Sequence, residues 1–464
     1  MTLTFIADNY LRINYQIAKA SGLFAKLNEW EVFDQERYWR AQIHNPRAPK
    51  APYTYKVYKI DGEDILIQRG LIGRLRTLPQ ELMITDKRIC VPFVRELPLP
   101  DVRAYQATAT DWAIENEQGI IWAETGSGKT RIVSSIVQRI KQRTLVIVPT
   151  LDIQDQFLEE LRHSLEIAPG AMGGGENFEG EEATVAQAQH FRNWTQEQWG
   201  AFVTGYGCVV IDEAHLAHRK LAEHFPAKYR FGLTATPDIV MGSSEVLQWS
   251  FGKKLHVASH HELVEGGFRV QPQFDWLHTE FVADNPADYQ SILECLVKDE
   301  TRCKLIATNV RNRWLNGHSC LVLCGQKAYG KALVDTMAGL GAPAVLLTSD
   351  TAREARKTLL DRARKGEIKI IVATSLADVG LDVPLLDTLY LAFPGRSSNL
   401  THQRIGRVLR RAPDKSEPMV VDVVDDFVPT LFSQALHREA TFKAYGNLPK
   451  KLTREKKKQR HPVF

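Results

Sequence analysis

The stretch of sequence that decides the fold is Ala123-Glu-Thr-Gly-Ser-Gly-Lys-Thr130. It follows the short apolar run Gly119-Ile-Ile-Trp122 and precedes a helical pattern over 129–141. A strand, a glycine-rich loop and a helix in this order are the context of a phosphate-binding loop. The glycines let backbone N–H groups approach a phosphate closely, and the helix presents its positive N-terminus to the same anion. The stretch therefore predicts a nucleotide-binding α/β domain.

Individual residues of this loop have separate expected roles. Lys129 would reach the β- and γ-phosphates of ATP, and Thr130 would place a hydroxyl on Mg²⁺. Ala123 replaces the first glycine of the general pattern, which exchanges one small residue for another. The alternative is a glycine-rich turn with an accidental Lys-Thr pair, but it does not explain the flanking strand and helix. We expect nucleotide binding by Glu124, Thr125, Gly126, Ser127, Gly128, Lys129 and Thr130.

An acidic motif follows later in the chain, Val209-Val-Ile-Asp212-Glu213-Ala214-His215. An apolar strand that ends in a carboxylate is the expected second half of a nucleotide site. Asp212 would hold Mg²⁺, and Glu213 would orient or deprotonate the attacking water. Acidic residues commonly end strands, so the pair is a weak signal alone. After a phosphate loop it predicts ATP hydrolysis.

Apolar runs alternate with helical stretches along most of the chain, and such runs suit strands buried on both faces of a parallel sheet. A second set of runs begins after residue 267. Before residue 98 the pattern predicts a helix over 15–33 and a strand, turn and strand over 53–67. The predicted fold class is α/β, with two tandem parallel-sheet domains after a small α+β domain. The expected divisions are 1–98, 99–268, 269–440 and a basic tail over 441–464.

The composition excludes several classes of protein. With 464 residues, 44% hydrophobic and 25% charged, the chain is unlike a disordered or fibrous protein. No run approaches about 18 apolar residues, and the first residues lack the pattern of a secretory signal, so we expect a cytoplasmic protein without a membrane span.

The six cysteines include no Cys-x-x-Cys pair. His215 and His218 have no second ligand pair at zinc-like spacing, so we expect free thiols and no structural zinc.

The net charge of +4 is unevenly distributed. Residues 1–100 carry +4, residues 101–435 carry −7, and residues 436–464 carry +7. Basic ends around an acidic middle favour a polyanionic partner, although terminal segments are also often basic for solubility.

The motif Asp212-Glu-Ala-His215 resembles that of the superfamily 2 helicases and translocases, and the resemblance covers most of 101–425. It implies two RecA-like domains. Within Arg103-Ala-Tyr-Gln106, it implies adenine recognition by Arg103 and Gln106. It also implies nucleic-acid contacts by Pro149, Thr150 and Gln187, and coupling of hydrolysis to movement by Thr234 and Thr236.

The second half of the chain continues the resemblance. It implies nucleic-acid contacts by Gly325 and Thr374, and nucleotide contacts by Gly380 and Asp382. Within Gln403-Arg-Ile-Gly-Arg407-Val-Leu-Arg410, helical spacing places Gln403, Arg407 and Arg410 on one face. These residues would act on the γ-phosphate, the arginines as fingers supplied within the same chain. The alternative is a basic helix face in water.

The chain also contains Gly173-Gly-Gly175, Phe251-Gly252 and Glu262-Leu-Val-Glu-Gly-Gly267, with about 100 residues before the motor. In these features it resembles the phage UvsW-type recombination and branch-migration helicases, most closely that of phage T5. The resemblance implies a bacterial or phage-infected host cell and a monomer that binds forked, branched or duplex DNA. The N-terminal domain would contact duplex DNA near a junction. Its candidate phosphate-binding residues are Lys56, Lys59, Arg69, Arg74, Arg76, Lys87 and Arg88.

The expected function is thus ATP- and Mg²⁺-dependent unwinding or branch migration of DNA. One alternative is an RNA helicase, because the motor reads a backbone. Another is an ATP-gated DNA-binding module without unwinding, but Glu213, Arg407 and Arg410 argue against it, since binding alone needs no hydrolytic machinery. No membrane partner is expected.

Overall fold

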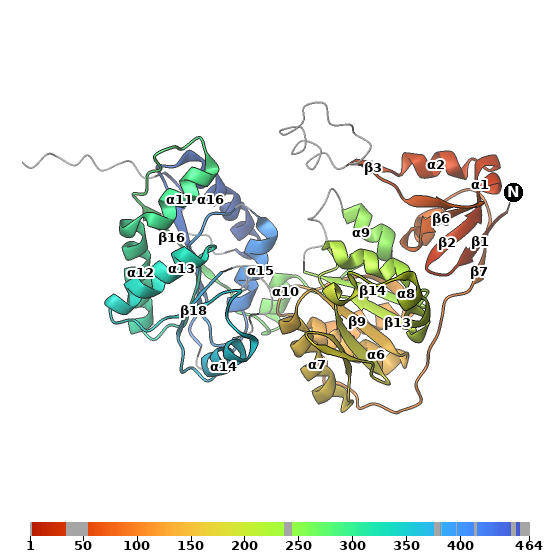
Figure 1. Ribbon diagram of the computed structural model, residues 1–464, viewed down its shortest axis with the longest axis horizontal. Helices are drawn as coiled ribbons and strands as arrows, with labels where there is room; N and C mark the ends of the chain where they lie inside the picture. Colours follow the sequence, from red (N-terminus) through yellow and green to blue (C-terminus); the bar gives the residue numbers. More distant parts are fainter. Residues whose placement is uncertain are drawn as a thin grey trace, which may run out of the picture. The chain divides into compact units, whose positions relative to one another are not determined.

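The computed structural model describes residues 2–33, 54–235, 244–374, 381, 383–395, 397–412, 415–446 and 452–454. The chain forms two compact units, residues 1–258 and 259–464, and each is described separately (Figure 1). The predicted fold class is confirmed, because two parallel sheets follow an N-terminal mixed sheet.

The N-terminal sheet has five strands in the order β5-β6-β2-β1-β7. They are β1 (Leu3–Ala7), β2 (Tyr10–Asn14), β5 (Tyr58–Asp61), β6 (Asp64–Gln68) and β7 (Leu82–Asp86). β5 and β6 pair antiparallel, with Asp61 opposite Asp64, which confirms the predicted turn and the strands directly beside it. β1 and β7 are parallel, while the other pairs are antiparallel.

The helix predicted over 15–33 is broken. The chain forms α1 (Tyr15–Ala20) and α2 (Leu23–Glu29), then the short strand β3 (Val32–Phe33). Gly22, at φ +77°, separates the two helices, because the left-handed conformation ends one helix and turns the chain into the next. The strand predicted from residue 53 is also divided, into β4 (Thr54–Tyr55), which pairs with β3, and β5. The next short helical segments are η2 (Arg69–Leu71) and α4 (Ile72–Leu75).

The second sheet of the first unit has eight strands in the order β11-β10-β12-β9-β13-β14-β8-β15. All neighbours are parallel except β10 and β11, which form an edge hairpin. The strands are β8 (Gln118–Trp122), β9 (Thr144–Val148), β10 (Gly170–Gly173), β11 (Glu176–Phe178), β12 (Ala183–Gln187), β13 (Cys208–Ile211), β14 (Tyr229–Thr234) and β15 (Lys254–His256).

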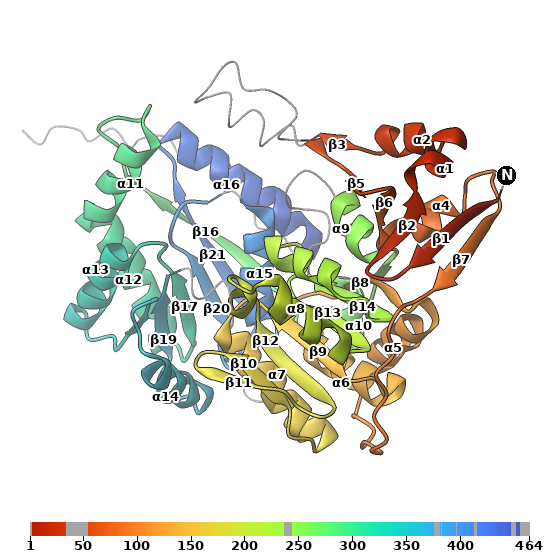
Figure 2. The same ribbon diagram turned by 45° about the vertical axis from the view of Figure 1, so that its right-hand side comes forward.

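Helices cover both faces of this sheet (Figure 2). One side carries α5 (Ala104–Asn116), α6 (Lys129–Ile140) and α7 (Leu151–Leu165). The other carries α8 (Gln196–Phe202) and α9 (Ser244–Phe251), whose aromatic residues share one apolar core. The remaining helical segments are η3 (Ala188–Phe191), η4 (Val203–Gly205), η5 (Ala217–His224) and, at the start of the second unit, α10 (His260–Glu265).

The second unit contains a six-stranded parallel sheet in the order β16-β21-β20-β17-β19-β18. Its strands are β16 (Gln273–Thr279), β17 (Cys320–Leu323), β18 (Val345–Leu347), β19 (Ile370–Ala373), β20 (Thr388–Leu391) and β21 (Met419–Asp425). Alternate residues of β17 enter different cores: Cys320 and Val322 pack on one face, and Leu321 and Leu323 on the other. Because both faces of β17 are buried, every residue of the strand is apolar.

The first of these faces is covered by α11 (Tyr289–Lys298), α12 (Glu300–Leu315) and α13 (Lys327–Gly339). The second is covered by α14 (Arg353–Arg364) and α15 (Ser398–Val408). The chain continues through α16 (Pro429–Phe442) and η7 (Lys443–Tyr445). Phe442 and Tyr445 enter the core of this unit, so its packed part extends beyond the expected boundary at 440.

The N-terminal sheet docks on the eight-stranded sheet within the first unit. Arg69, only 1% exposed, donates from its guanidinium to Gln118 Oε1 (2.8 Å) and to the carbonyl oxygen of Ala227 (2.7 Å). Trp249 and Val246 of α9 complete the apolar core of the N-terminal sheet. The finer division at 98 stays a prediction, but the two sheets share one packed interface.

No helix in the described part of the chain is long and apolar enough to cross a bilayer. All six cysteines are free thiols. Cys208, Cys303, Cys320 and Cys324 are buried, whereas Cys90 is exposed.

Candidate nucleotide-binding and motor site

The glycine-rich loop connects β8 to α6 as the sequence predicts. Gly126 and Gly128 have φ values of +83° and +81°, which residues with a side chain rarely adopt. A Cβ on Gly128 would lie 2.4 Å from Gln106 Nε2, so a side chain here would displace the Gln106 amide. α6 begins at Lys129 with no side-chain cap, and its N-terminal N–H groups suit an anion.

The first turn of α5 fastens this loop. Gln106 donates from Nε2 to the Ser127 carbonyl oxygen (2.8 Å) and accepts from the Arg103 backbone N–H (2.9 Å). Tyr105 donates its hydroxyl to the same Ser127 oxygen (2.8 Å) and accepts from Arg103 Nη1 (2.9 Å). The motif predicts roles for Arg103 and Gln106 but not for Tyr105. Its place between them on one helical turn is the signal that could have identified it.

Lys129 links the loop to the acidic motif. Its ammonium lies 3.2 Å from Glu213 Oε1 and 3.9 Å from Asp212 Oδ1. Burial lowers the pKa of Lys129, but the charges of Glu213 and Asp212 outweigh burial, so the pKa lies above its usual value. Burial raises the pKa of Asp212 to about 6, with Lys129 opposing and Glu213 adding to the shift. The three groups form one partly buried charge cluster after β8 and β13.

Glu213 has a strained backbone and connects the cluster to β14. Its φ of +46° is unusual for a residue other than glycine, and such strain is often found at functional sites. Glu213 Oε2 lies 3.3 Å from His215 Nδ1, which in turn lies 3.0 Å from Thr234 Oγ1. The contacts therefore run from the phosphate loop to Thr234. Thr236, the second predicted coupling residue, lies outside the described residues.

The donor set beside Lys129 fits Mg²⁺. The Asp212 carboxylate is 3% exposed and follows β13, and Thr130 stands in the first turn of α6. Carboxylate and hydroxyl oxygens are the ligands that Mg²⁺ takes beside nucleotide phosphates. These are the two residues that the sequence predicts as metal ligands.

The predicted nucleic-acid contacts of the first unit lie at one edge of its sheet. Pro149 and Thr150 follow β9, and Gln187 ends β12 directly opposite Val148. Asp212 follows β13, which is parallel to both strands, so these residues share the carboxyl edge. The Thr150 side chain also caps α7 by accepting from the Ile153 N–H.

In the second unit, Gly325 and Thr374 likewise follow parallel strands, β17 and β19. Gly325 has a φ of +66°, and a Cβ there would lie 2.2 Å from the Phe393 ring, which explains the glycine. Gly380 and Asp382, predicted to contact nucleotide, lie outside the described residues.

The expectation that Gln403, Arg407 and Arg410 share one helix face is wrong for Arg410. α15 ends at Val408, and Arg410 forms an antiparallel bridge with Arg269. The Val270 N–H donates to the Leu409 carbonyl (3.1 Å), so pairing with a distant segment replaces the next helical turn. Gln403 and Arg407 remain on the helix. Arg407 is 9% exposed and donates to the Leu381 carbonyl oxygen (2.7 Å).

Two candidate phosphate-binding residues of the N-terminal domain are not exposed, and both have partners within the protein. Arg69 is buried in the interface described above, which contradicts a role on a DNA-binding surface. Arg88 Nη2 lies 2.7 Å from both Asp86 Oδ2 and Glu117 Oε2. The other candidates, Lys56, Lys59, Arg74, Arg76 and Lys87, are exposed.

Family comparisons cover both sets of motifs. Residues 99–239 match the family described as Type III restriction enzyme, res subunit. Residues 290–412 match the family described as Helicase conserved C-terminal domain. The first match spans the phosphate loop and acidic motif, and the second spans β17 to Arg410.

Several relatives resemble the chain over most of its length. DNA 3'-5' translocase XPB2 of Sulfurisphaera tokodaii is 28% identical over 380 residues, which are 71% of this chain and 84% of the relative. A protein of Sulfolobus islandicus filamentous virus, described as a candidate helicase, is 28% identical over 90% of this chain and 82% of its own. Probable helicase D10 of Escherichia phage T5 is 22% identical, with 74% and 75% covered. The expected similarity to a phage T5 protein is therefore present but weaker than that to the first two relatives.

A solved structure of the ATP-dependent Type ISP restriction-modification enzyme LlaBIII has a TM-score of 0.58 and 13% identity. The match covers 75% of this chain and 30% of that one, and it supports the fold alone. Together the two family models match more than half of the chain, in the order of the two units. With its ATP-binding loop and acidic motif in the first match, the chain is a superfamily 2 helicase ATPase.

Proposed function

We propose that this protein is an ATP-driven DNA translocase that unwinds forks or moves branch points. The observation that carries the proposal is the chain of contacts from Lys129 through Glu213 and His215 to Thr234. It connects a phosphate-binding residue to the end of β14, where Thr234 is one of the two proposed coupling residues. DNA as the substrate is supported by the similarity to an archaeal protein named as a DNA translocase.

For ATP hydrolysis, Lys129 binds the β- and γ-phosphates once these compete with its pairing to Glu213. Glu213, released from Lys129, orients or deprotonates the attacking water, while His215 stays between Glu213 and Thr234. Thr130 and Asp212 would hold Mg²⁺, which neutralises charge on the phosphates when bound. Arg103 and Gln106 recognise the adenine, and Glu124, Thr125 and Ser127 complete the loop around the phosphates.

The second unit supplies positive charge in this proposal. Arg407 and Arg410 stabilise the transition-state charge on the γ-phosphate, and Gln403 orients the reacting groups. Gly380 and Asp382 contact the nucleotide. ATP and ADP differ in the γ-phosphate that these residues bind, so hydrolysis changes the affinity of the nucleotide for the protein.

Nucleic acid would follow the carboxyl edges of the sheets. Pro149, Thr150 and Gln187 in the first unit, and Gly325 and Thr374 in the second, contact the sugar–phosphate backbone. Thr234 and Thr236 transmit the state of the phosphates to these contacts. The exposed lysines and arginines of the N-terminal sheet hold duplex DNA beside a junction through phosphates, without reading sequence.

The experiment compares ATP hydrolysis with duplex, four-way junction and single-stranded DNA and with RNA, beside strand displacement on a junction. We expect junction DNA to stimulate hydrolysis most and to be processed only with ATP. Stimulation by RNA alone would overturn the DNA assignment, and hydrolysis without junction processing would reduce the proposal to translocation.

Lys129→Ala tests the proposed site within the same assays. It should lower hydrolysis at least about a hundredfold, because it removes a preorganised charge from the phosphates. Leu436→Ala, an exposed residue of α16, is the control and should retain activity. Junction processing that persists in Lys129→Ala would exclude this site as the motor.

A further inference from the structure

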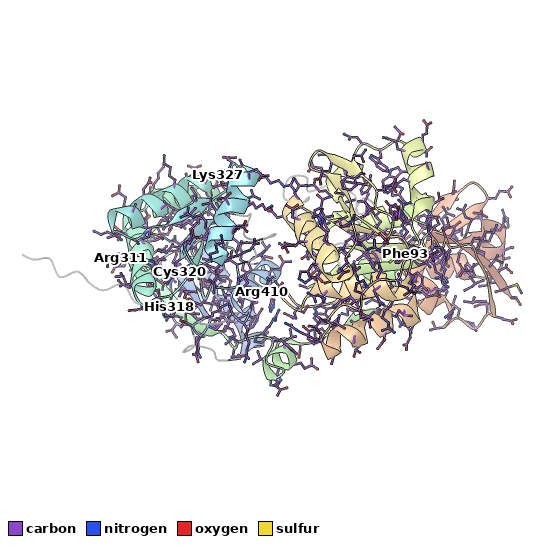
Figure 3. All side chains as sticks on the ribbon, turned by 90° about the horizontal axis from the view of Figure 1, so that it is seen from below. Phe93, Arg311, His318, Cys320, Lys327 and Arg410 are labelled. Carbon is purple, nitrogen blue, oxygen red and sulfur yellow. The ribbon has the colours of Figure 1, made fainter. Side chains whose placement is uncertain are left out.

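Lys415 holds the backbone at the end of α15. Its ammonium donates to the carbonyl oxygen of Arg410 (2.7 Å) and to that of Pro384 (2.9 Å). Arg410, labelled in Figure 3, is the residue proposed above as an arginine finger. Pro384 lies three residues after Leu381 in the sequence. One side chain thus joins two separate segments of the second unit.

Two further contacts hold the same segment. The Val270 N–H donates to the Leu409 carbonyl (3.1 Å), and Arg407 donates to the Leu381 carbonyl (2.7 Å). A helix leaves its last carbonyl groups without helical partners, and a cation near the C-terminus is favourable. Among these contacts, only that of Lys415 places a charged donor on the backbone of Arg410 itself.

We propose that Lys415 is a positioning residue for ATP hydrolysis, which fixes the backbone from which the Arg410 guanidinium reaches the γ-phosphate. The inference rests on the proposed role of Arg410. Small displacements of a catalytic group have large effects on rate, so a loosened backbone lowers turnover even when ATP still binds. Lys415 itself touches neither nucleotide nor nucleic acid in this proposal.

The surroundings of Lys415 make its charge sensitive to pH. Burial lowers the pKa of Lys415 to about 8, with Asp387 raising it and Arg410 lowering it. Asp387 also binds His318 (Nδ1 to Oδ1, 3.1 Å) and accepts from the Thr388 hydroxyl (2.6 Å). The charged form of Lys415 is therefore lost as pH rises through about 8. Its charge-assisted hydrogen bonds weaken in that range.

The test measures kcat and KM for ATP, at saturating junction DNA, in Lys415→Met and in the control Lys369→Met. Lys369 is an exposed residue that directly precedes β19, and Thr374 directly follows the other end of the same strand. We expect Lys415→Met to lower kcat about ten- to a hundredfold, the scale on which misplaced groups act. Its KM should change by less than about twofold, because ATP binding is retained. Lys369→Met should match the wild type.

A pH profile separates positioning from folding, and its wild-type part does not depend on the stability of any variant. The wild-type kcat should fall as pH rises through about 8, Lys415→Met should lack this alkaline decline, and Lys415→Arg should shift it upward. A wild-type kcat that stays level through this range overturns the inference, as does an unchanged kcat in Lys415→Met. A loss of ATP binding and thermal stability together would assign Lys415 a structural role instead.

Arg410→Ala distinguishes this inference from the proposed function. If Arg410→Ala loses hydrolysis and Lys415→Met does not, only the positioning role fails. If Arg410→Ala retains full hydrolysis, the finger assignment fails and the role of Lys415 fails with it, while the DNA assays above still decide the substrate.

Discussion

The carbonyl oxygen of Ser127 accepts two hydrogen bonds, from the Tyr105 hydroxyl and from the Gln106 side-chain amide. Both donors come from the first turn of α5, which lies outside the phosphate loop in the sequence. A carbonyl held on two sides orients the adjacent peptide groups, whose N–H groups would bind phosphate. At this scale, loop geometry depends on residues outside the loop.

Tyr105→Phe should raise KM for ATP about two- to tenfold, because the loop loses one hydrogen bond of about 0.5–1.5 kcal/mol. The value of kcat should stay close to that of the wild type, since Gln106 still holds Ser127. Steady-state ATPase assays measure both constants. Tyr289→Phe, which changes a 41% exposed tyrosine of α11, is the matched control. A lower kcat with unchanged KM would contradict this role for Tyr105.

Single residues also show what sequence can and cannot predict. The closeness of Lys129 to Asp212 and Glu213 was predictable, because each motif is local and parallel strands bring their carboxyl ends to one edge. The position of Arg410 was not, because it depends on pairing with Arg269, which is far away in the sequence. Helical spacing alone predicts that the helix reaches Arg410, whereas α15 ends at Val408.

At the scale of elements, η2 and α9 pack so closely that their contact excludes a side chain. A Cβ on Gly70 of η2 would lie 2.1 Å from the Gln248 carbonyl oxygen and 2.5 Å from the Trp249 carbonyl oxygen. Both neighbours are backbone atoms of α9, which cannot move without shifting the helix. The N-terminal sheet therefore docks by backbone approach as well as through Arg69.

Gly70→Ala should destabilise the first unit by about 1–3 kcal/mol, the usual cost of overpacking. Gly73→Ala is the matched control, because a Cβ there meets nothing within 4 Å and Gly73 lies in α4. It should be neutral or stabilising by about 0.5–1 kcal/mol. Denaturant unfolding of both variants measures the difference. Equal stability of the two would show that the contact between η2 and α9 does not constrain docking.

Element prediction succeeded where strands are continuous and apolar and failed where breaks depend on one residue. The uninterrupted runs Thr144-Leu-Val-Ile-Val148, Cys208-Val-Val-Ile211 and Thr388-Leu-Tyr-Leu391 predict strands, and β9, β13 and β20 lie at these runs. The helix over 15–33 was divided by Gly22, whose left-handed conformation the apolar pattern does not reveal. β16 lies at the sheet edge and is buried only in part, so it lacks the apolar run typical of the inner strands.

At the scale of the whole molecule, the charge distribution acquires a more specific interpretation. The −7 segment contains the ATP site, so its nucleic-acid contacts would use hydroxyls and backbone groups more than net charge. In the N-terminal domain, Arg69 and Arg88 have protein partners, which reduces the basic surface available to DNA. Most of the remaining excess positive charge lies after residue 435.

Removal of residues 455–464 should weaken DNA binding and reduce its salt dependence, while hydrolysis at saturating DNA stays largely unchanged. The deletion removes Lys456, Lys457, Lys458 and Arg460. It retains Leu452, which packs against Val424 and Ala435, so the core of the second unit stays intact. Each phosphate that is no longer neutralised reduces the slope of log affinity against log salt concentration by about 0.9, so we expect a decrease of about 1–3. Fluorescence anisotropy over a salt series measures this slope.

Deletion of residues 461–464 alone is the control, because it removes no lysine or arginine. Equal slopes for the two deletions would mean that the basic residues do not contact DNA.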